Sequence, residues 1–292
     1  MRLGCWFGTP SYAAVLLVLA VDVLGLPATA PAQTTELDRL VGRDLWKDHL
    51  PPAQQKSLDK ILGKVPKGSF TEPRPWHVWK TNRDGQTRYI VLLGETVFVF
   101  PGGSSACIQL FDAAAKRIHS WSFLTGWRLD LGSASIKSST DVAGDTIVFQ
   151  MKRYMGRNVA KEYFALSNDQ LHFVRMENDK GEAIQNEYVY PNFEIGIVPD
   201  ASTEDQWASI LESKDKAVVL SALVFLGGRH LTEPERRFTD NTRASKYAGL
   251  FQQLLSSPRI RGLVQGLANS ENEWIKQAAK LAARGSRERL FE

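Results

Sequence analysis

Histidine and cysteine are the residues best suited to metal or nucleophilic chemistry, and this chain has five of the first and two of the second. It contains neither a His-Glu-x-x-His nor a Cys-x-x-Cys pattern, both of which are typical of zinc sites. No partner residue can be assigned to His119, which shares a predicted strand face with Trp121, so we expect a hydrogen-bonded structural histidine. The sequence therefore predicts no metal site, no cofactor and no catalytic residue.

Two further segments contain residue types that can do chemistry. Residues 101–106 are the most glycine-rich stretch, but they lack the Gly-x-Ser-x-Gly order of a nucleophile elbow and the lysine of a phosphate loop. We expect them only to connect two strands. Carboxylates gather near a predicted hairpin, at Glu177, Asp179, Glu182 and Glu187. They could do acid/base work or bind calcium, although a solvated turn is the commoner arrangement.

Tryptophans could form either a core or a ligand-binding face, and four of the eight lie within residues 74–198. Buried tryptophans dominate cores, whereas exposed ones could stack on sugar rings. Trp127 and Arg128 follow Leu124-Thr125-Gly126, which indicates a loop position. The candidate binding residues are therefore Trp121, Trp127 and Arg128.

The charge of the chain argues against nucleic acid as a partner. The formal net charge is +4, and residues 33–73, 74–198 and 199–292 carry excesses of +1, +1 and +2. Because no segment is strongly basic, a surface that follows phosphates is not indicated.

The N-terminus has the pattern of a secretory signal peptide. Arg2 precedes an apolar stretch over residues 12–26, and Ala30-Pro31-Ala32 is a small-residue cleavage pattern. The stretch is shorter than the roughly 20 residues of a membrane helix. Residues 1–32 are therefore predicted to be removed, which leaves no membrane span. We expect an exported protein of the periplasm or cell envelope.

The elements that must position these residues divide the rest of the chain into three segments. Residues 33–73 predict a helical lead-in and a linker, because apolar residues at helical spacing precede a proline-rich stretch. Residues 74–198 predict an antiparallel β domain, with turns at 82–85, 168–169 and 178–181, where Asn, Asp and Gly tolerate positive φ. Its nine candidate strands are 76–81, 88–93, 96–100, 107–111, 117–123, 146–151, 160–166, 170–176 and 186–190.

Residues 199–292 return to helical periodicity. Thr203 with Gln206, and Ser270 with Glu273, have the spacing of capping boxes at helix starts. The predicted helices are 204–212, 214–226, 244–255, 259–268 and 271–284.

Two of these helices form an internal repeat with an offset of 57 residues. Residues 213–228 align without gaps with residues 270–285, and both contain a serine, a polar triplet, a central alanine and a closing glycine. The pattern resembles the second helix of HEAT-type repeats, which implies stacked helices with a surface suited to protein binding. The alternative is a small helical bundle with an accidental likeness. A true repeat requires Ala222 and Ala279 to be buried alike.

The predicted fold class is α+β: an antiparallel β-sandwich or partly open β-barrel, flanked by the N-terminal helical segment and a C-terminal HEAT-like helical domain. We expect a non-catalytic scaffold or binding protein of the cell envelope that takes a protein partner on its C-terminal helices. A β domain that binds a glycan or an apolar ligand such as a lipid is one alternative. A hydrolase of unrecognised type is another.

Overall fold

The computed structural model describes two antiparallel sheets and the helices around them. The described residues are 35–43, 45, 48, 50–63, 74–83, 85–97, 103–126, 129–153, 158–184, 201, 203–227 and 253–284. Those after Thr35 belong to one compact unit, Glu36–Glu292. The predicted signal peptide, residues 1–32, lies outside the described residues.

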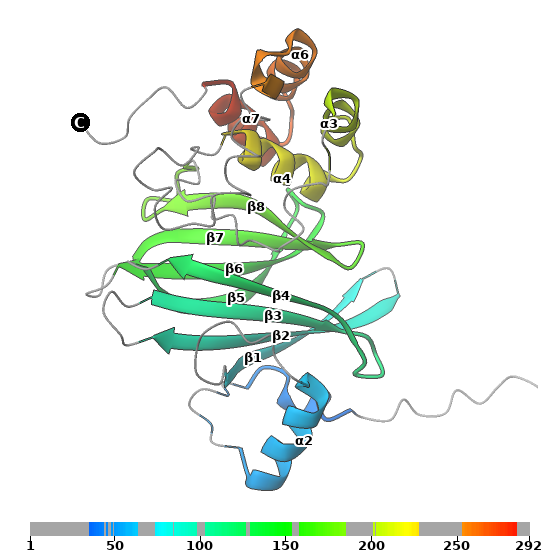
Figure 1. Cartoon of the computed structure of the whole chain (residues 1–292), viewed down its shortest axis with the longest axis vertical. Coiled ribbons are helices and arrows are strands. Elements are labelled where there is room, and N and C mark those ends of the chain that lie inside the picture. The colour runs from blue at the N-terminus through cyan, green and yellow to red at the C-terminus, as the bar shows by residue number, and fades with distance from the viewer. Residues whose placement is uncertain are drawn as a thin grey trace, which may run out of the picture. The chain divides into compact units, whose positions relative to one another are not determined.

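Each sheet is an open meander of four strands, hydrogen-bonded in the order of the sequence (Figure 1). The fold is therefore α+β, as predicted, with two open sheets and no closed barrel among the described residues. Sheet A contains β1 (Arg74–Arg83), β2 (Gln86–Val97), β3 (Gly103–Phe111) and β4 (Arg117–Gly126). Sheet B contains β5 (Leu129–Ser139), β6 (Gly144–Arg153), β7 (Asn158–Ser167) and β8 (Gln170–Asn178).

The strands differ from the sequence prediction in three places. Residues 103–106, expected only to connect two strands, belong to β3. Residues 88–93 and 96–97, expected in two strands, lie in the single strand β2. Strand β5 is not predicted at all, because its sequence is rich in serine and has one β-branched residue, Ile136. It forms by pairing along its length with β6. The candidate strand 186–190 lies outside the described residues.

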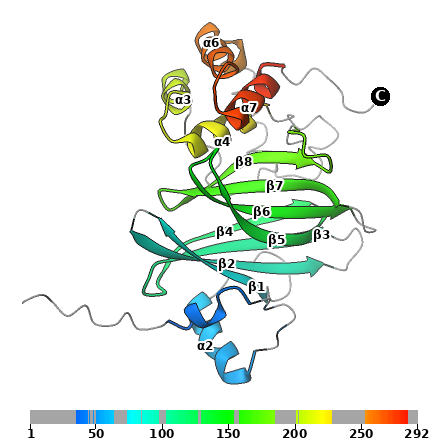
Figure 2. The ribbon, with the colours of Figure 1, turned by 180° about the vertical axis from the view of Figure 1, so that it is seen from behind.

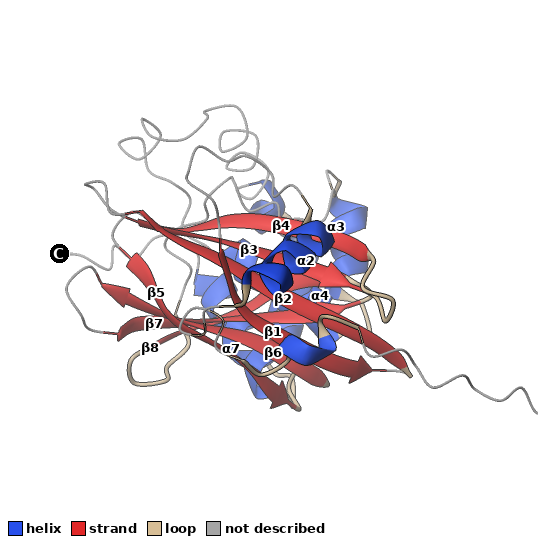
Figure 3. Cartoon of the chain, turned by 90° about the horizontal axis from the view of Figure 1, so that it is seen from below, coloured by secondary structure: helices blue, strands red, loops and turns tan. Residues whose placement is uncertain are grey.

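Both faces of sheet A are buried. On β2, Ile90 and Leu92 belong to one hydrophobic cluster, and Val91 and Leu93 belong to another, because alternate side chains point to opposite faces. The second cluster is completed by the N-terminal elements η1 (Asp38–Leu40) and α2 (Pro52–Leu62). Seen from below, α2 lies across sheet A (Figure 3).

A tryptophan packs directly on the backbone of sheet A. The register shift between Pro75 and His77 turns Trp76 toward the core that the two sheets share. Its ring covers Gly94, where an added Cβ would lie 2.4 Å from Cε2 of Trp76. A side chain at Gly94 is therefore incompatible with this position of the indole.

Four helices cover the opposite face of sheet B. Helices α4 and α7 lie next to the sheet, and α3 and α6 lie outside them (Figure 2). Most of α4 is buried. The predicted helix 244–255 lies almost entirely outside the described residues. The helix bounds are α3 (Glu204–Leu211), α4 (Lys216–Gly227), α6 (Pro258–Leu267) and α7 (Glu273–Arg284).

The pairs α3–α4 and α6–α7 are two helical hairpins, each made of consecutive helices in contact. Ser213 and Ser270 precede the second helix of each hairpin, and each hydroxyl accepts the backbone N–H two residues on, at 3.1 and 3.2 Å. Ala222 and Ala279 are both fully buried, as a true repeat requires. The resemblance to HEAT-type repeats itself stays a prediction.

One hydrophobic cluster runs from the inner face of sheet A through sheet B to the four helices. The predicted boundary between residues 198 and 199 lies outside the described residues, so the division into a β and a helical domain stays a prediction. Within the described part of the chain, each helix is too short or too polar to cross a membrane.

Candidate functional site

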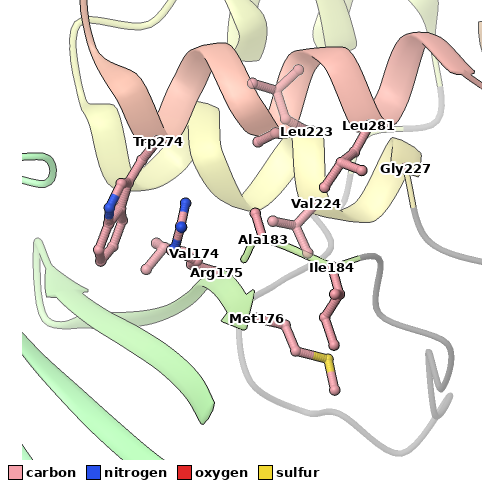
Figure 4. A pocket seen from close by; sticks show the side chains of 11 residues that line it. Val174, Arg175, Met176, Ala183, Ile184, Leu223, Val224, Gly227, Trp274 and Leu281 are labelled. Carbon is pink, nitrogen blue, oxygen red and sulfur yellow. The ribbon is translucent and has the colours of Figure 1, made fainter. Parts of the chain in front are cut away.

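A small pocket lies where β8, α4 and α7 meet (Figure 4). Its walls are mostly apolar, and its cavity volume of about 20 Å³ is enough for about one water molecule or a methyl group. Along α7, Trp274 stands at one end of the pocket and Leu281 at the other. The remaining lining residues are Val174, Arg175, Met176, Ala183, Ile184, Leu223, Val224, Gly227 and Ala278.

The floor of the pocket is built by a tight turn after β8. Asn178 Oδ1 accepts the backbone N–H groups of Lys180 and Glu182, and Gly181 has a φ of 82°. This turn, which the sequence predicts, returns the chain so that the N–H of Ile184 donates to the carbonyl of Met176 at 3.0 Å. Hydrophobic residues are thereby placed beside the edge of β8.

The roof of the pocket depends on a close approach of α4 and α7. An added Cβ at Gly227 would lie 3.2 Å from the Cα of Ala282. Ala278, Ala279 and Ala282 are the buried small residues of α7 at this contact. Small side chains on both helices therefore set the width of the pocket.

A buried polar network closes one end of the pocket. Arg175 Nε donates to Glu177 at 2.7 Å, and Nη1 donates to Gln277 Oε1 of α7 at 2.8 Å. The guanidinium also lies over the ring of Trp274, 5.1 Å from its centroid. The hydroxyl of Tyr163 on β7 donates to the second oxygen of Glu177 at 2.8 Å.

The electrostatics of this network favour a rigid contact between α7 and sheet B. Burial, together with the hydrogen bond to Glu177, raises the pKa of Tyr163 above its usual value, so the phenol stays protonated and acts as a donor. The side chains of Arg175 and Glu177 are only 9% and 12% exposed. Glu177 balances the charge of Arg175 within β8, and the hydrogen bond from Arg175 to Gln277 holds α7 on sheet B.

A serine, an aspartate and a histidine also converge, at the start of α4. Ser167 Oγ donates to Asp215 Oδ2 at 2.6 Å, and Asp215 Oδ1 caps α4 by accepting the N–H of Ala217 at 2.9 Å. His172 is hydrogen-bonded to the backbone of Ser167, and burial lowers the pKa of its imidazole. The serine thus bonds to the carboxylate and not to the imidazole, which differs from a nucleophilic triad.

Of the three sequence-predicted binding residues, the structure describes only Trp121. Trp121 is 4% exposed and packs in the core, with its ring centroid 5.3 Å from that of His119. Trp127 and Arg128 lie outside the described residues. Their role in ligand binding stays a prediction. Cys107 is buried, with its Sγ 3.4 Å from Ser120 Oγ.

Arg175 and Trp274 are site residues that the sequence did not predict. A signal for the first is its place within the apolar run Leu171–Met176, where a charge needs a buried partner. Trp274 has no such signal, because its position beside Arg175 depends on how α7 packs on β8.

No model of a protein family matches this chain, and neither the curated proteins nor the solved structures include a significantly similar one. The function is therefore argued from the geometry of the pocket.

Proposed function

We propose that this chain is an exported, non-catalytic protein of the cell envelope that binds a partner protein on its C-terminal helices. The N-terminal apolar stretch with its small-residue cleavage pattern supports the export. The pocket between β8, α4 and α7 supports the mode of binding, and its size is the observation that carries the proposal.

The size of the pocket favours a protein over a small molecule. Sites for small molecules enclose about 300–1,000 Å³, whereas this cavity has about 20 Å³. A pocket of that size suits the tip of one apolar side chain, which a partner would insert as an anchor while its neighbours contact the helices around it.

The surroundings of the pocket favour recognition without rearrangement. The bond from Arg175 to Gln277 fixes α7 on sheet B, and the ion pair with Glu177, also on β8, holds the guanidinium in place. A rigid binding site loses little conformational entropy when a partner binds, which favours affinity.

The test is capture of partners from native envelope extract by residues 33–292, quantified by mass spectrometry. Val224→Phe places a larger side chain at the half-buried wall of the pocket. Val218→Phe is the matched control, since Val218 is also half-buried on α4 but does not line the pocket.

We expect a saturable partner that the control variant retains and Val224→Phe loses. Capture of no protein by the wild type, or equal capture by both variants, contradicts the proposal. Circular dichroism of all three proteins verifies that each is folded.

A further inference from the structure

The internal repeat aligns two residues of α4 with residues of a different type on α7. Helix α7 packs on α4 beside Leu223 and Gly227. At the offset of 57 residues, the equivalents of these two residues on α7 are Lys280 and Arg284. In the first hairpin, these two positions on α4 are an apolar and a small residue beside the next helix. In the second hairpin, the equivalent positions on α7 are two basic residues.

These two basic residues border the pocket. Trp274, Ala278 and Leu281 line the pocket from α7. Residues three and four apart are neighbours on a helix, so Arg284 lies next to Leu281 and Lys280. Lys280 and Arg284 are both exposed.

Acids balance these two cations only in part. Glu273 pairs with Lys276, and hydrogen bonds from Lys276 and Gln277, together with the charges of Lys276 and Lys280, lower the pKa of its carboxyl. No ion pair joins Lys280 or Arg284 to any acid that the structure describes. On the neighbouring helix α6, Arg259 pairs with Asp205 of α3. The surface beside the pocket thus combines an apolar hollow with two exposed cations.

We propose that Lys280, Leu281 and Arg284, the row of α7 that borders the pocket, dock an acidic amphipathic helix of the partner protein. This helix stacks on α7 as α7 stacks on α4, with one apolar side chain in the pocket and carboxylates against Lys280 and Arg284. The inference rests on the proposed protein-binding function and specifies the chemistry of the partner.

The experiment selects binders from a displayed library of short helix-forming peptides against residues 33–292. The binders are then measured against Lys280→Glu/Arg284→Glu. The matched control is Lys56→Glu/Lys60→Glu, which reverses two exposed lysines at the same helical spacing on α2.

We expect selected peptides with acidic residues flanking an apolar one. Their affinity falls by about tenfold in the α7 variant and is unchanged in the α2 variant, because only the former reverses the charges they face. Replacing the glutamates of a selected peptide with lysines restores its binding to the α7 variant and abolishes its binding to the wild type.

Four results would overturn the inference. Selected peptides that lack acidic residues contradict the inference, and so do peptides with equal affinity for both charge variants. If Val224→Phe still weakens the binding of such peptides, the proposed protein-binding function stands without the acidic partner. Selection of no peptide contradicts it as well. Binding of phosphatidylglycerol vesicles that depends on Lys280 and Arg284, without selected peptides, assigns the row to an anionic lipid surface.

Discussion

Arg88 and Asp169 join the two sheets through a bidentate ion pair. Nε of Arg88 lies 2.7 Å from one carboxylate oxygen of Asp169, and Nη2 lies 2.9 Å from the other. Arg88 belongs to β2 of sheet A, whereas Asp169 is in the turn between β7 and β8, where its φ is 57°. Asp169 therefore adopts the left-handed backbone conformation of the turn, and its carboxylate fixes one sheet against the other.

Replacing Asp169 with Asn should separate these two roles, because asparagine also tolerates positive φ. The hydrogen bond from Arg88 and its charge lower the pKa of Asp169. A carboxyl with a lowered pKa stabilises the fold above its unfolded pKa, and this stabilisation is lost as pH falls through the folded value. The pair is partly exposed, so we expect Asp169→Asn to lose about 1 kcal/mol near pH 7.

Urea unfolding of both proteins across pH measures this difference. It should shrink as pH falls below the usual pKa of an aspartate and through the lowered folded pKa, where the wild-type carboxyl becomes protonated as well. A difference that persists unchanged in acid would place the effect in the turn and not in the ion pair.

Glu162 should make the protein less stable as pH rises. On β7 it pairs in register with Phe149 and Met176, and it is 7% exposed. Burial raises the pKa of its carboxyl from 4.5 to about 7. The folded state then holds a proton that the unfolded state has released, so stability falls between about pH 4.5 and 7, by up to about 3 kcal/mol.

Glu162→Gln removes this dependence, because its amide does not ionise. We expect the variant to exceed the wild type in stability by about 2–3 kcal/mol near pH 8 and to match it within about 1 kcal/mol near pH 5. Chemical unfolding at the two pH values tests this, with exposed Glu212→Gln as the control. Parallel pH profiles for wild type and Glu162→Gln would contradict the assignment.

Local signals in the sequence were sufficient for the turns and caps. Asn168 and Asp169 both have positive φ, at 51° and 57°, as their residue types predict. Thr203 and Gln206 form the predicted capping box. The prediction at Ser270 was wrong in detail: the side chain of Asn272 accepts the N–H of Ile275 and so caps α7.

The site could not be predicted in the same way, because it depends on contacts between distant segments. Arg175 and Gln277 are 102 residues apart, and nothing in either segment specifies the other. Strand β5 shows the same limit: its Ser-rich sequence has low strand preference, and its pairing with β6 decides its conformation.

The ion pair of Arg175 with Glu177, at one end of the pocket, should give a large coupling energy between its two residues. Glu177→Leu leaves the guanidinium of Arg175 buried without its carboxylate, which we expect to destabilise the protein by about 3–5 kcal/mol. Arg175→Met/Glu177→Leu removes both charges and should lose less than the sum of the two single variants, by more than about 1 kcal/mol. Urea unfolding of the four proteins gives this coupling energy, and additive losses would show that the two charges act independently.

Gly94→Ala should destabilise the sandwich because Trp76 occupies the space of the new side chain. The added Cβ would lie 2.4 Å from the indole, and a ring held in the core cannot move away without opening a void. We expect a loss of about 2–3 kcal/mol in thermal or urea unfolding. Gly262→Ala on α6 is the matched control: nothing lies within 4 Å of its new Cβ, and the helical position should gain about 0.5–1 kcal/mol. In a Trp76→Leu background the loss from Gly94→Ala should shrink, since the smaller side chain can give way. An unchanged loss there would assign the effect to the backbone of β2 and not to the indole.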